Sequence, residues 1–234
     1  MLADWPAVQV SVVILVATVV RSAFGFGEAL VAVPLLALLV PVNIAGPVAV
    51  LASILIALIT LTQDWREVHI RSAGWLVLST LFGVPLGLLL LRDAAEAIVK
   101  SILGALIVAF SIFSLVSHRD HKLKDDSWAW LFGFSAGVLG GAYGMNGPPL
   151  VVYGSLRRWS PGHFRATLQG YFLLASIAGM AGYWIAGLWT PAVSRYFLFS
   201  LPSVFVGTLA GRMLNRRMDA GMPTAVNPGC PVAG

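Results

Sequence analysis

Arg21 and Glu28 are two charged residues in a stretch that is otherwise apolar and rich in glycine. Ionisable side chains are rare inside a membrane, and where they occur they usually serve function. Arg21 can neutralise a sulfonate or carboxylate with paired hydrogen bonds, and Glu28 can titrate and so bind a coupling proton. Two simpler interpretations stay open, namely a purely structural Arg21–Glu28 ion pair and simple exposure of these residues at the membrane surface.

A second distinctive segment, residues 144–149, reads Gly-Met-Asn-Gly-Pro-Pro. Asn146 and the preceding Tyr143 can donate hydrogen bonds there. Glycine permits close backbone approach, and proline suits the first turn of a helix, where an N–H group would have no partner. Helices that start near Ala29 and Pro149 would therefore direct backbone N–H groups and a positive dipole end at an anion. Tight helix packing is the alternative reason for the same glycines and prolines.

Nine residues form the candidate anion-binding site on this reasoning. They are Arg21, Gly25, Gly27, Glu28, Tyr143, Gly144, Asn146, Gly147 and Pro148. No catalytic residue, metal site or cofactor is predicted, and the single cysteine, Cys230, allows neither an internal disulfide nor a cysteine-based metal site.

The composition places these residues in a membrane protein. Of 234 residues, 58% are hydrophobic and 11% are charged, whereas a soluble domain has about 25% charged residues. An ordinary soluble enzyme and a disordered chain are both excluded. The net charge of +5 does not indicate nucleic acid as a partner, because the basic residues fall in short loops between apolar runs. An all-α, polytopic membrane protein is the predicted fold class.

The apolar runs are interrupted at the two chemically distinctive segments. One span needs about 20 mostly apolar residues, and the charge-free stretches are 29–63, 72–91, 101–117, 127–156, 166–194 and 196–211. We interpret residues 21–28 and 144–149 as elbows, each joining two short helices inside the membrane. A non-helical elbow at that depth must be buried in protein or line a watery cavity. Ordinary short helices joined by a surface loop are the alternative.

The positions of the basic residues predict the orientation. Eleven of the 15 lysines and arginines lie in four connections that would share one side, and cytoplasmic loops carry such an excess. The opposite side would hold Arg92, Lys100 and Arg195. We therefore expect a multi-pass protein of the cell (inner) membrane with its N-terminus outside and the 118–126 loop and C-terminal tail in the cytoplasm.

The two halves of the chain resemble each other at an offset near 120 residues. Gly25 corresponds to Gly144, Pro41 to Pro161, and the pair Gly83-x-x-x-Gly87 to Gly207-x-x-x-Gly211. Each half would be a broken segment followed by full spans, so the halves would cross the membrane in opposite directions. Inverted repeats with broken helices are typical of transporters, with the substrate site between the repeats near the midplane.

Two motifs carry a family resemblance. Residues 25–35 read Gly-Phe-Gly-Glu-Ala-Leu-Val-Ala-Val-Pro-Leu, and residues 144–151 read Gly-Met-Asn-Gly-Pro-Pro-Leu-Val, followed by Phe-Arg-Ala-Thr-Leu-Gln at 164–169. They resemble the glycine-rich motifs of the sulfite exporter TauE/SafE family of membrane permeases, over about residues 8–217. The resemblance implies movement of sulfite, sulfonates or other small organic anions. This chain departs from the family at Glu28, where a glycine is frequent.

The predicted organisation has four parts. The first repeat covers 1–117, a basic loop 118–126, an incomplete second repeat 127–217, and a tail 218–234. The tail contains three prolines and three glycines, so it cannot form the counterpart of the 101–117 span. We therefore expect the tail to be extended, poorly ordered and cytoplasmic. Either a partner subunit or lipid would then cover the place of the missing helix, or the chain is a truncated permease.

The favoured function is that of a secondary transporter of a small anion, with the binding site at the two elbows near mid-membrane. No Walker-type sequence for ATP binding is present. The expected partners are the lipid bilayer, the anion and a coupling proton or ion, and a homo-oligomer is possible. A membrane-embedded enzyme and a structural membrane partner without transport activity are the competing hypotheses.

Overall fold

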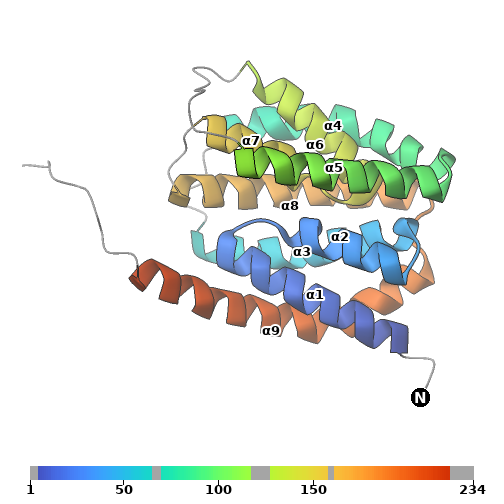
Figure 1. The fold of residues 1–234 in the computed structure, drawn as a ribbon, viewed down its shortest axis with the longest axis horizontal. Coiled ribbons are helices and arrows are strands. Elements are labelled where there is room, and N and C mark those ends of the chain that lie inside the picture. The colour runs from blue at the N-terminus through green and yellow to red at the C-terminus, as the bar shows by residue number, and fades with distance from the viewer. Residues whose placement is uncertain (1–4, 65–69, 117–126, 158–160, 222–234) are drawn as a thin grey trace, which may run out of the picture.

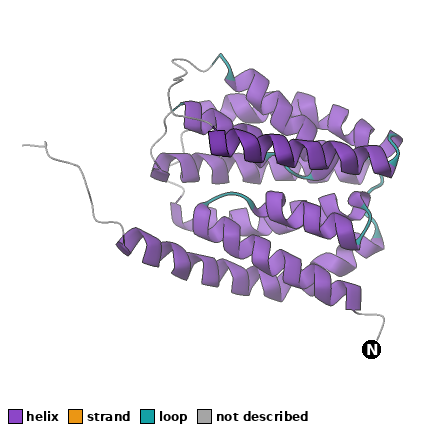
Figure 2. Ribbon diagram, viewed as in Figure 1, coloured by secondary structure: helices purple, strands orange, loops and turns teal. Residues whose placement is uncertain are grey.

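The computed structural model describes residues 5–64, 70–116, 127–157 and 161–221. Within these ranges the chain forms nine α-helices and no β-strand (Figures 1 and 2). The helices are α1 (Trp5–Phe24), α2 (Glu28–Leu39), α3 (Val42–Asp64), α4 (Ile70–Asp93), α5 (Glu96–Val116), α6 (Ala129–Tyr143), α7 (Gly147–Leu156), α8 (Pro161–Ile185) and α9 (Pro191–Gly221).

The helices confirm the predicted all-α membrane protein. Four stretches of the described chain are long and apolar enough to cross a membrane: Trp5–Phe24, Val42–Leu61, Gly74–Asp93 and Pro191–Asn215. Shorter apolar helices accompany them, namely α2, α6 and the greater part of α5. The basic loop 118–126 lies outside the described residues. Helix α9 continues to Gly221, so the tail predicted to begin at 218 is helical in its first four residues.

The helices are interrupted at both predicted elbows, but the interruptions are shorter than the sequence indicates. The first break comprises residues 25–27, and the second break comprises residues 144–146. Arg21 lies in the last turn of α1 and Glu28 is the first residue of α2. The prediction that both flanking helices of the first elbow are short was wrong for α1, which has 20 residues and the length of a full span.

Glycines in left-handed conformations produce the breaks. Gly27 has φ 95° and Gly144 has φ 67°, values that other residues adopt only at a cost. At the second break, Gly144 N–H donates to the Gly140 carbonyl at 2.8 Å, and Met145 N–H donates to the Leu139 carbonyl at 3.2 Å. With Gly144 in the left-handed conformation, the bond from Gly144 to Gly140 is that of the αL motif, which ends many α-helices. The chain then turns at the second break into the start of α7.

Two matched pairs of glycines hold the halves of the chain together. Gly83 and Gly87 of α4 press against the backbone of α6, where a Cβ on Gly87 would lie 2.7 Å from the Ala142 nitrogen. Gly207 and Gly211 of α9 press against α1 in the same way. Small residues allow such close approach between helices in membranes. Thus α4, from the first half, packs on α6, from the second, while α9 packs on α1 (Figure 1).

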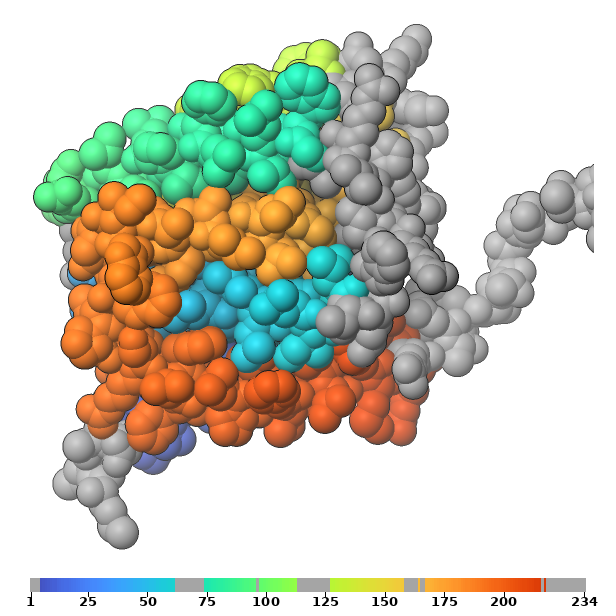
Figure 3. All heavy atoms as spheres, turned by 180° about the vertical axis from the view of Figure 1, so that it is seen from behind, coloured from blue at the N-terminus to red at the C-terminus, as the bar shows by residue number. Residues whose placement is uncertain are grey.

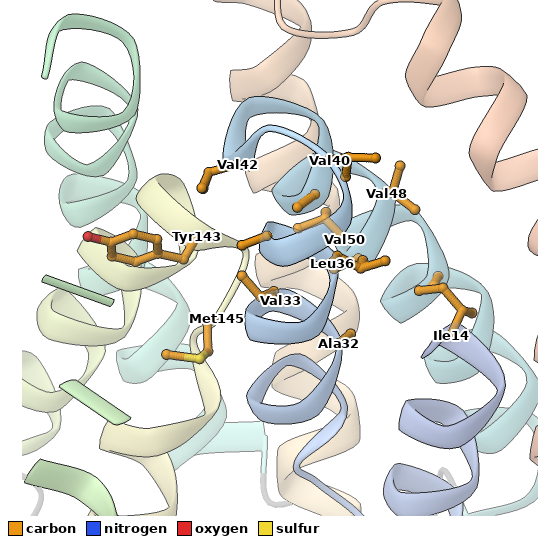
Figure 4. Packing of buried hydrophobic residues seen from close by; sticks show 14 of the residues in the cluster. Ile14, Ala32, Val33, Leu36, Val40, Val42, Val48, Val50, Tyr143 and Met145 are labelled. Carbon is orange, nitrogen blue, oxygen red and sulfur yellow. The ribbon is translucent and has the colours of Figure 1, made fainter. Parts of the chain in front are cut away.

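Helices α3 and α8 lie between these two helix pairs. From behind, the surface shows α4, α8, α3 and α9 in successive bands (Figure 3), and α3 packs directly on α8. The larger hydrophobic core joins α2 and α3 to the second break, with Val33 of α2 facing Met145 (Figure 4). The larger core therefore holds the second break against α2 and α3.

Candidate functional site

Arg21 and Glu28 form a buried ion pair across the first break. Nη1 of Arg21 donates to Oε2 of Glu28 at 2.5 Å, and each side chain is 3% exposed. Of the two alternatives considered from the sequence, exposure at the membrane surface is excluded by this burial, and the ion pair is present.

Three further side chains hold the Arg21 guanidinium. Nη1 also donates to Oγ of Ser53 in α3, and Nη2 donates to Oε1 of Gln169 in α8 at 2.9 Å. The ring of Phe172 lies beneath the guanidinium, 4.9 Å from its centre to Cζ, a favourable cation–π distance. Gln169 in turn donates from Nε2 to the Gly25 carbonyl at 2.9 Å. Helices α1, α2, α3 and α8 thus all contribute to the position of one cation.

Two polar atoms of the ion pair remain without hydrogen-bond partners among the described residues. They are Nε of Arg21 and Oε1 of Glu28, and both are buried. Buried polar atoms are nearly always hydrogen-bonded in folded proteins, so each exception needs an explanation. An oxygen of a ligand can accept from Nε of Arg21, and a proton can bind at Oε1 of Glu28.

A small cavity beside the ion pair joins the two breaks. Its volume is about 20 Å³, which is on the order of the space that one water molecule needs. Its lining comes from both halves of the chain. The lining residues are Arg21, Gly27, Glu28, Ala29, Leu30, Ser53, Gly144, Met145, Asn146, Gly147, Pro148 and Phe172. We call this space the Arg21 cavity.

The helices that follow the breaks begin at this cavity. Gly27 precedes α2 and Asn146 precedes α7, and neither helix start has a side-chain cap. The first N–H groups of a helix have no partner within it, and Glu28, Ala29 and Leu30 of the first turn of α2 line the cavity. In α7 only Gly147 can donate among the first three residues, because Pro148 and Pro149 follow it. The start of α2 therefore offers more donors than the start of α7.

The structure brings together seven of the nine predicted site residues. Gly25 and Tyr143 do not line the Arg21 cavity. Gly25 contributes its carbonyl to Gln169 instead, and the hydroxyl of Tyr143 donates to the Val99 carbonyl of α5 at 3.0 Å. Tyr143 thus fastens the end of α6 to α5, because its ring points away from the second break (Figure 4).

Three residues that hold Arg21 were not predicted for the site. Ser53 reads in the sequence as an ordinary packing serine of a span, and Phe172 as one of many apolar residues. Gln169 is the last residue of the Phe-Arg-Ala-Thr-Leu-Gln motif, and this motif is the sequence feature by which Gln169 could have been found. An uncharged side chain at the entry of a span becomes a site candidate only when the partner across the fold is known.

A second, smaller cavity continues from the second break. Its volume is about 10 Å³ and its polar lining includes Thr80, Asn146 and Ser176. Gly144 and Asn146 line both cavities. The second break therefore separates two small polar spaces in the interior.

Comparison with known proteins agrees with this architecture. A family model described as Sulfite exporter TauE/SafE matches residues 10–225. A curated protein of Cupriavidus necator, named "Probable sulfite/organosulfonate exporter TauE", is 27% identical over 181 residues, which cover 71% of this chain and 69% of the relative. No solved structure matches the chain.

Proposed function

Since the chain belongs to the sulfite exporter TauE/SafE family of membrane transporters, we propose that it carries a small anion with an –SO3 group across the cell membrane. The expected substrates are sulfite and organic sulfonates. The relative from Cupriavidus necator, whose name assigns it sulfite and organosulfonates, supports this substrate class. The family consists of transporters and not of enzymes, so the site is proposed for binding and not for catalysis.

The buried Arg21 beside an uncapped helix start is the observation that carries the proposal. Arginine pairs well with oxyanions because its donors form a planar fork. The positive end of the α2 dipole favours an anion at the same place. Sulfite and sulfonates share three oxygens on one sulfur, so one oxygen can accept from Arg21 and another from the first turn of α2. The –SO3 group would then lie in the Arg21 cavity, against the second break.

The cavity is too small for such an anion as it stands. A space of about 20 Å³ is on the order of one water molecule, whereas sulfite has four heavy atoms. We interpret this arrangement as a closed state of the transporter. Binding then requires the cavity to widen, either by movement of Glu28 away from Arg21 or by separation of the two breaks.

Matched contacts between the halves support the proposal of inverted repeats. The glycine pair of α4 packs on α6, and the corresponding pair of α9 packs on α1. Transporters built from inverted repeats move one repeat against the other around a fixed site. A site that both breaks line, as the Arg21 cavity is, would open to either side in such a motion. The outside N-terminus and a homo-oligomeric state remain predictions.

Reconstituted transport tests the proposal. Purified protein in liposomes is given [³⁵S]sulfite, with methanesulfonate, isethionate, acetate or chloride as unlabelled competitors. We expect saturable sulfite uptake that the two sulfonates inhibit and that acetate and chloride inhibit far less. Uptake equal to that of protein-free liposomes, or equal inhibition by acetate and sulfonates, would contradict the proposed substrate class.

A further inference from the structure

We propose that Glu28 is a built-in counter-anion of Arg21 that takes up one proton each time Arg21 binds a substrate anion. The anion and the proton then cross the membrane together, and a singly charged substrate moves without net charge. This inference rests on the proposed function, since it concerns how the same site is coupled. It deepens that function by naming the coupling ion and its binding atom.

The Glu28 carboxylate occupies the position that a substrate anion needs. Nη1 of Arg21 is shared between Glu28 and Ser53, and Nη2 is taken by Gln169. Only Nε lacks a partner in the described structure. Both N–H groups of Nη1 are thus taken, so a substrate oxygen that pairs with Nη1 must displace Glu28 or Ser53. Of these two, only Glu28 carries the same charge as the substrate.

Two anions beside a single buried cation would be strongly unfavourable. Arg21 is the only other charged side chain among the residues that line the cavity. The remaining lining residues include Ser53 of α3, Asn146 of the second break and Phe172 of α8, and none of the lining residues other than Glu28 and Arg21 carries an ionisable side chain. Inside a protein, a surplus charge is usually removed by protonation. When the substrate enters, Glu28 is thus the group that must become neutral.

The free carboxylate oxygen marks where the proton binds. Oε1 of Glu28 is buried without a partner, whereas Oε2 contacts Arg21. In the proposed cycle a proton from water forms an O–H bond at Oε1, the Arg21–Glu28 ion pair separates, and the guanidinium pairs with the anion. On the other side of the membrane the anion leaves, the O–H bond breaks, the proton passes to water and the ion pair forms again. The site is neutral in both states.

The carboxylate belongs to one half of the chain only. At the corresponding position of the second break, 119 residues further on, stands Gly147. The site therefore has one proton-binding group and one arginine, which predicts one proton for each anion.

Proton movement and voltage dependence test the proposal in the same liposomes. The probe is methanesulfonate, which stays singly charged over the working pH range, with pyranine inside the vesicles to report pH and valinomycin with potassium to set the potential. For the wild-type protein we expect a methanesulfonate gradient to move protons in the same direction, and accumulation that does not change with potential. If sulfite is transported and methanesulfonate is not, the same measurements are made with sulfite at acidic pH, where it is singly charged.

The variant Glu28→Gln removes the proton site and keeps Arg21. We expect it to transport the anion without proton movement and to respond to voltage, with an accumulation ratio that changes about tenfold for each 59 mV, as for any single charge. The matched control is Asp93→Asn, the same change at a side chain that is 68% exposed at the end of α4, and it should behave like the wild type.

The measurements separate a failure of the proton coupling from a failure of the proposed transport function. Voltage-dependent transport without proton movement in the wild type would overturn the coupling and leave the proposed function intact. Proton-coupled transport that persists in Glu28→Gln would show that another group binds the proton. If Glu28→Gln does not fold, the wild-type voltage and proton measurements still decide whether a proton accompanies each anion. Absence of any sulfite or methanesulfonate transport would contradict the proposed function itself.

Discussion

Ser176 donates a hydrogen bond to the hydroxyl of Ser53 over 3.4 Å, and these two serines are 123 positions apart in the chain. That separation is close to the offset at which the two halves of the sequence correspond. Helix α3 of the first half and helix α8 of the second half therefore meet at these serines. Because Ser53 also accepts from Arg21, this contact is directly connected to the candidate anion site. Any movement of one half against the other would act on Arg21 through this contact.

Substitution of Arg21 should separate the role of its charge from that of its shape. We expect Arg21→Ala to lower initial anion uptake by about 100-fold, because hydrogen bonds to charged groups contribute roughly 1.5–3 kcal/mol each. Arg21→Lys should keep measurable transport, since the charge remains although the planar fork is lost. Uptake is measured in liposomes at matched protein content. Wild-type rates for both variants would show that Arg21 is structural or peripheral.

The close packing of α4 on α6 predicts a strong effect of a single methyl group. In Gly87→Ala the new Cβ would lie 2.7 Å from the Ala142 nitrogen and 3.0 Å from the Gly141 Cα, and such overpacking costs about 1–3 kcal/mol. We expect a lower melting temperature in detergent. Gly104→Ala in α5 is the control, because a Cβ there meets nothing within 4 Å. Equal melting temperatures of the two variants would mean that α4 and α6 are not in close contact.

The left-handed glycine of the second break predicts a graded pair of variants. In Gly144→Ala, the new Cβ would meet Val50 Cγ2 at 2.9 Å in a backbone with φ +67°. Gly187→Ala has a similar φ of +72° but no atom within 4 Å of its Cβ. The only cost expected there is that of holding alanine in a left-handed backbone, roughly 1–2 kcal/mol of stability. We expect both variants to melt lower than the wild type, with Gly144→Ala lower still and impaired in transport. A larger loss for Gly187→Ala would contradict the packing of the second break on α3.

The predicted orientation can be read from cysteine labelling. After Cys230→Ser, a cysteine at exposed Ala95, between α4 and α5, should react in intact cells with a maleimide that cannot cross membranes. A cysteine at exposed Ser127, before α6, should react only after the membrane is permeabilised. The reverse pattern would place the N-terminus in the cytoplasm and would reverse the positive-inside assignment.

The sequence was sufficient to predict where the two breaks lie. Glycines and prolines interrupt the apolar runs there, and the two charges of the first segment marked it as unusual, although surface exposure of these charges stayed open until the structure showed them buried. Both inferences follow from local rules about helices and charges in membranes, and Gly27 and Gly144 have the left-handed conformations that break helices.

Contacts between distant segments could not be predicted in the same way. The length of α1 could not be read from its apolar run, because Arg21 interrupts that run, and the position of Gln169 beside Arg21 depends on how α8 packs on α3. Tyr143 was assigned to the site from its neighbours in sequence, yet its hydroxyl reaches α5. Such assignments need the tertiary arrangement, because a helix residue next to a site in sequence can point to the opposite side.

Binding of [³⁵S]sulfite to purified protein, measured by scintillation proximity, tests most directly whether Arg21 holds the anion. Arg21→Gln alone would leave Glu28 buried and unpaired, which costs about 3–5 kcal/mol, so the comparison uses Glu28→Gln and the double variant Arg21→Gln/Glu28→Gln. The melting temperature of each variant confirms that it is folded. We expect Glu28→Gln to bind sulfite at least as tightly as the wild type, and the double variant to show no saturable binding. Equal binding by these two variants would contradict an anion site at Arg21.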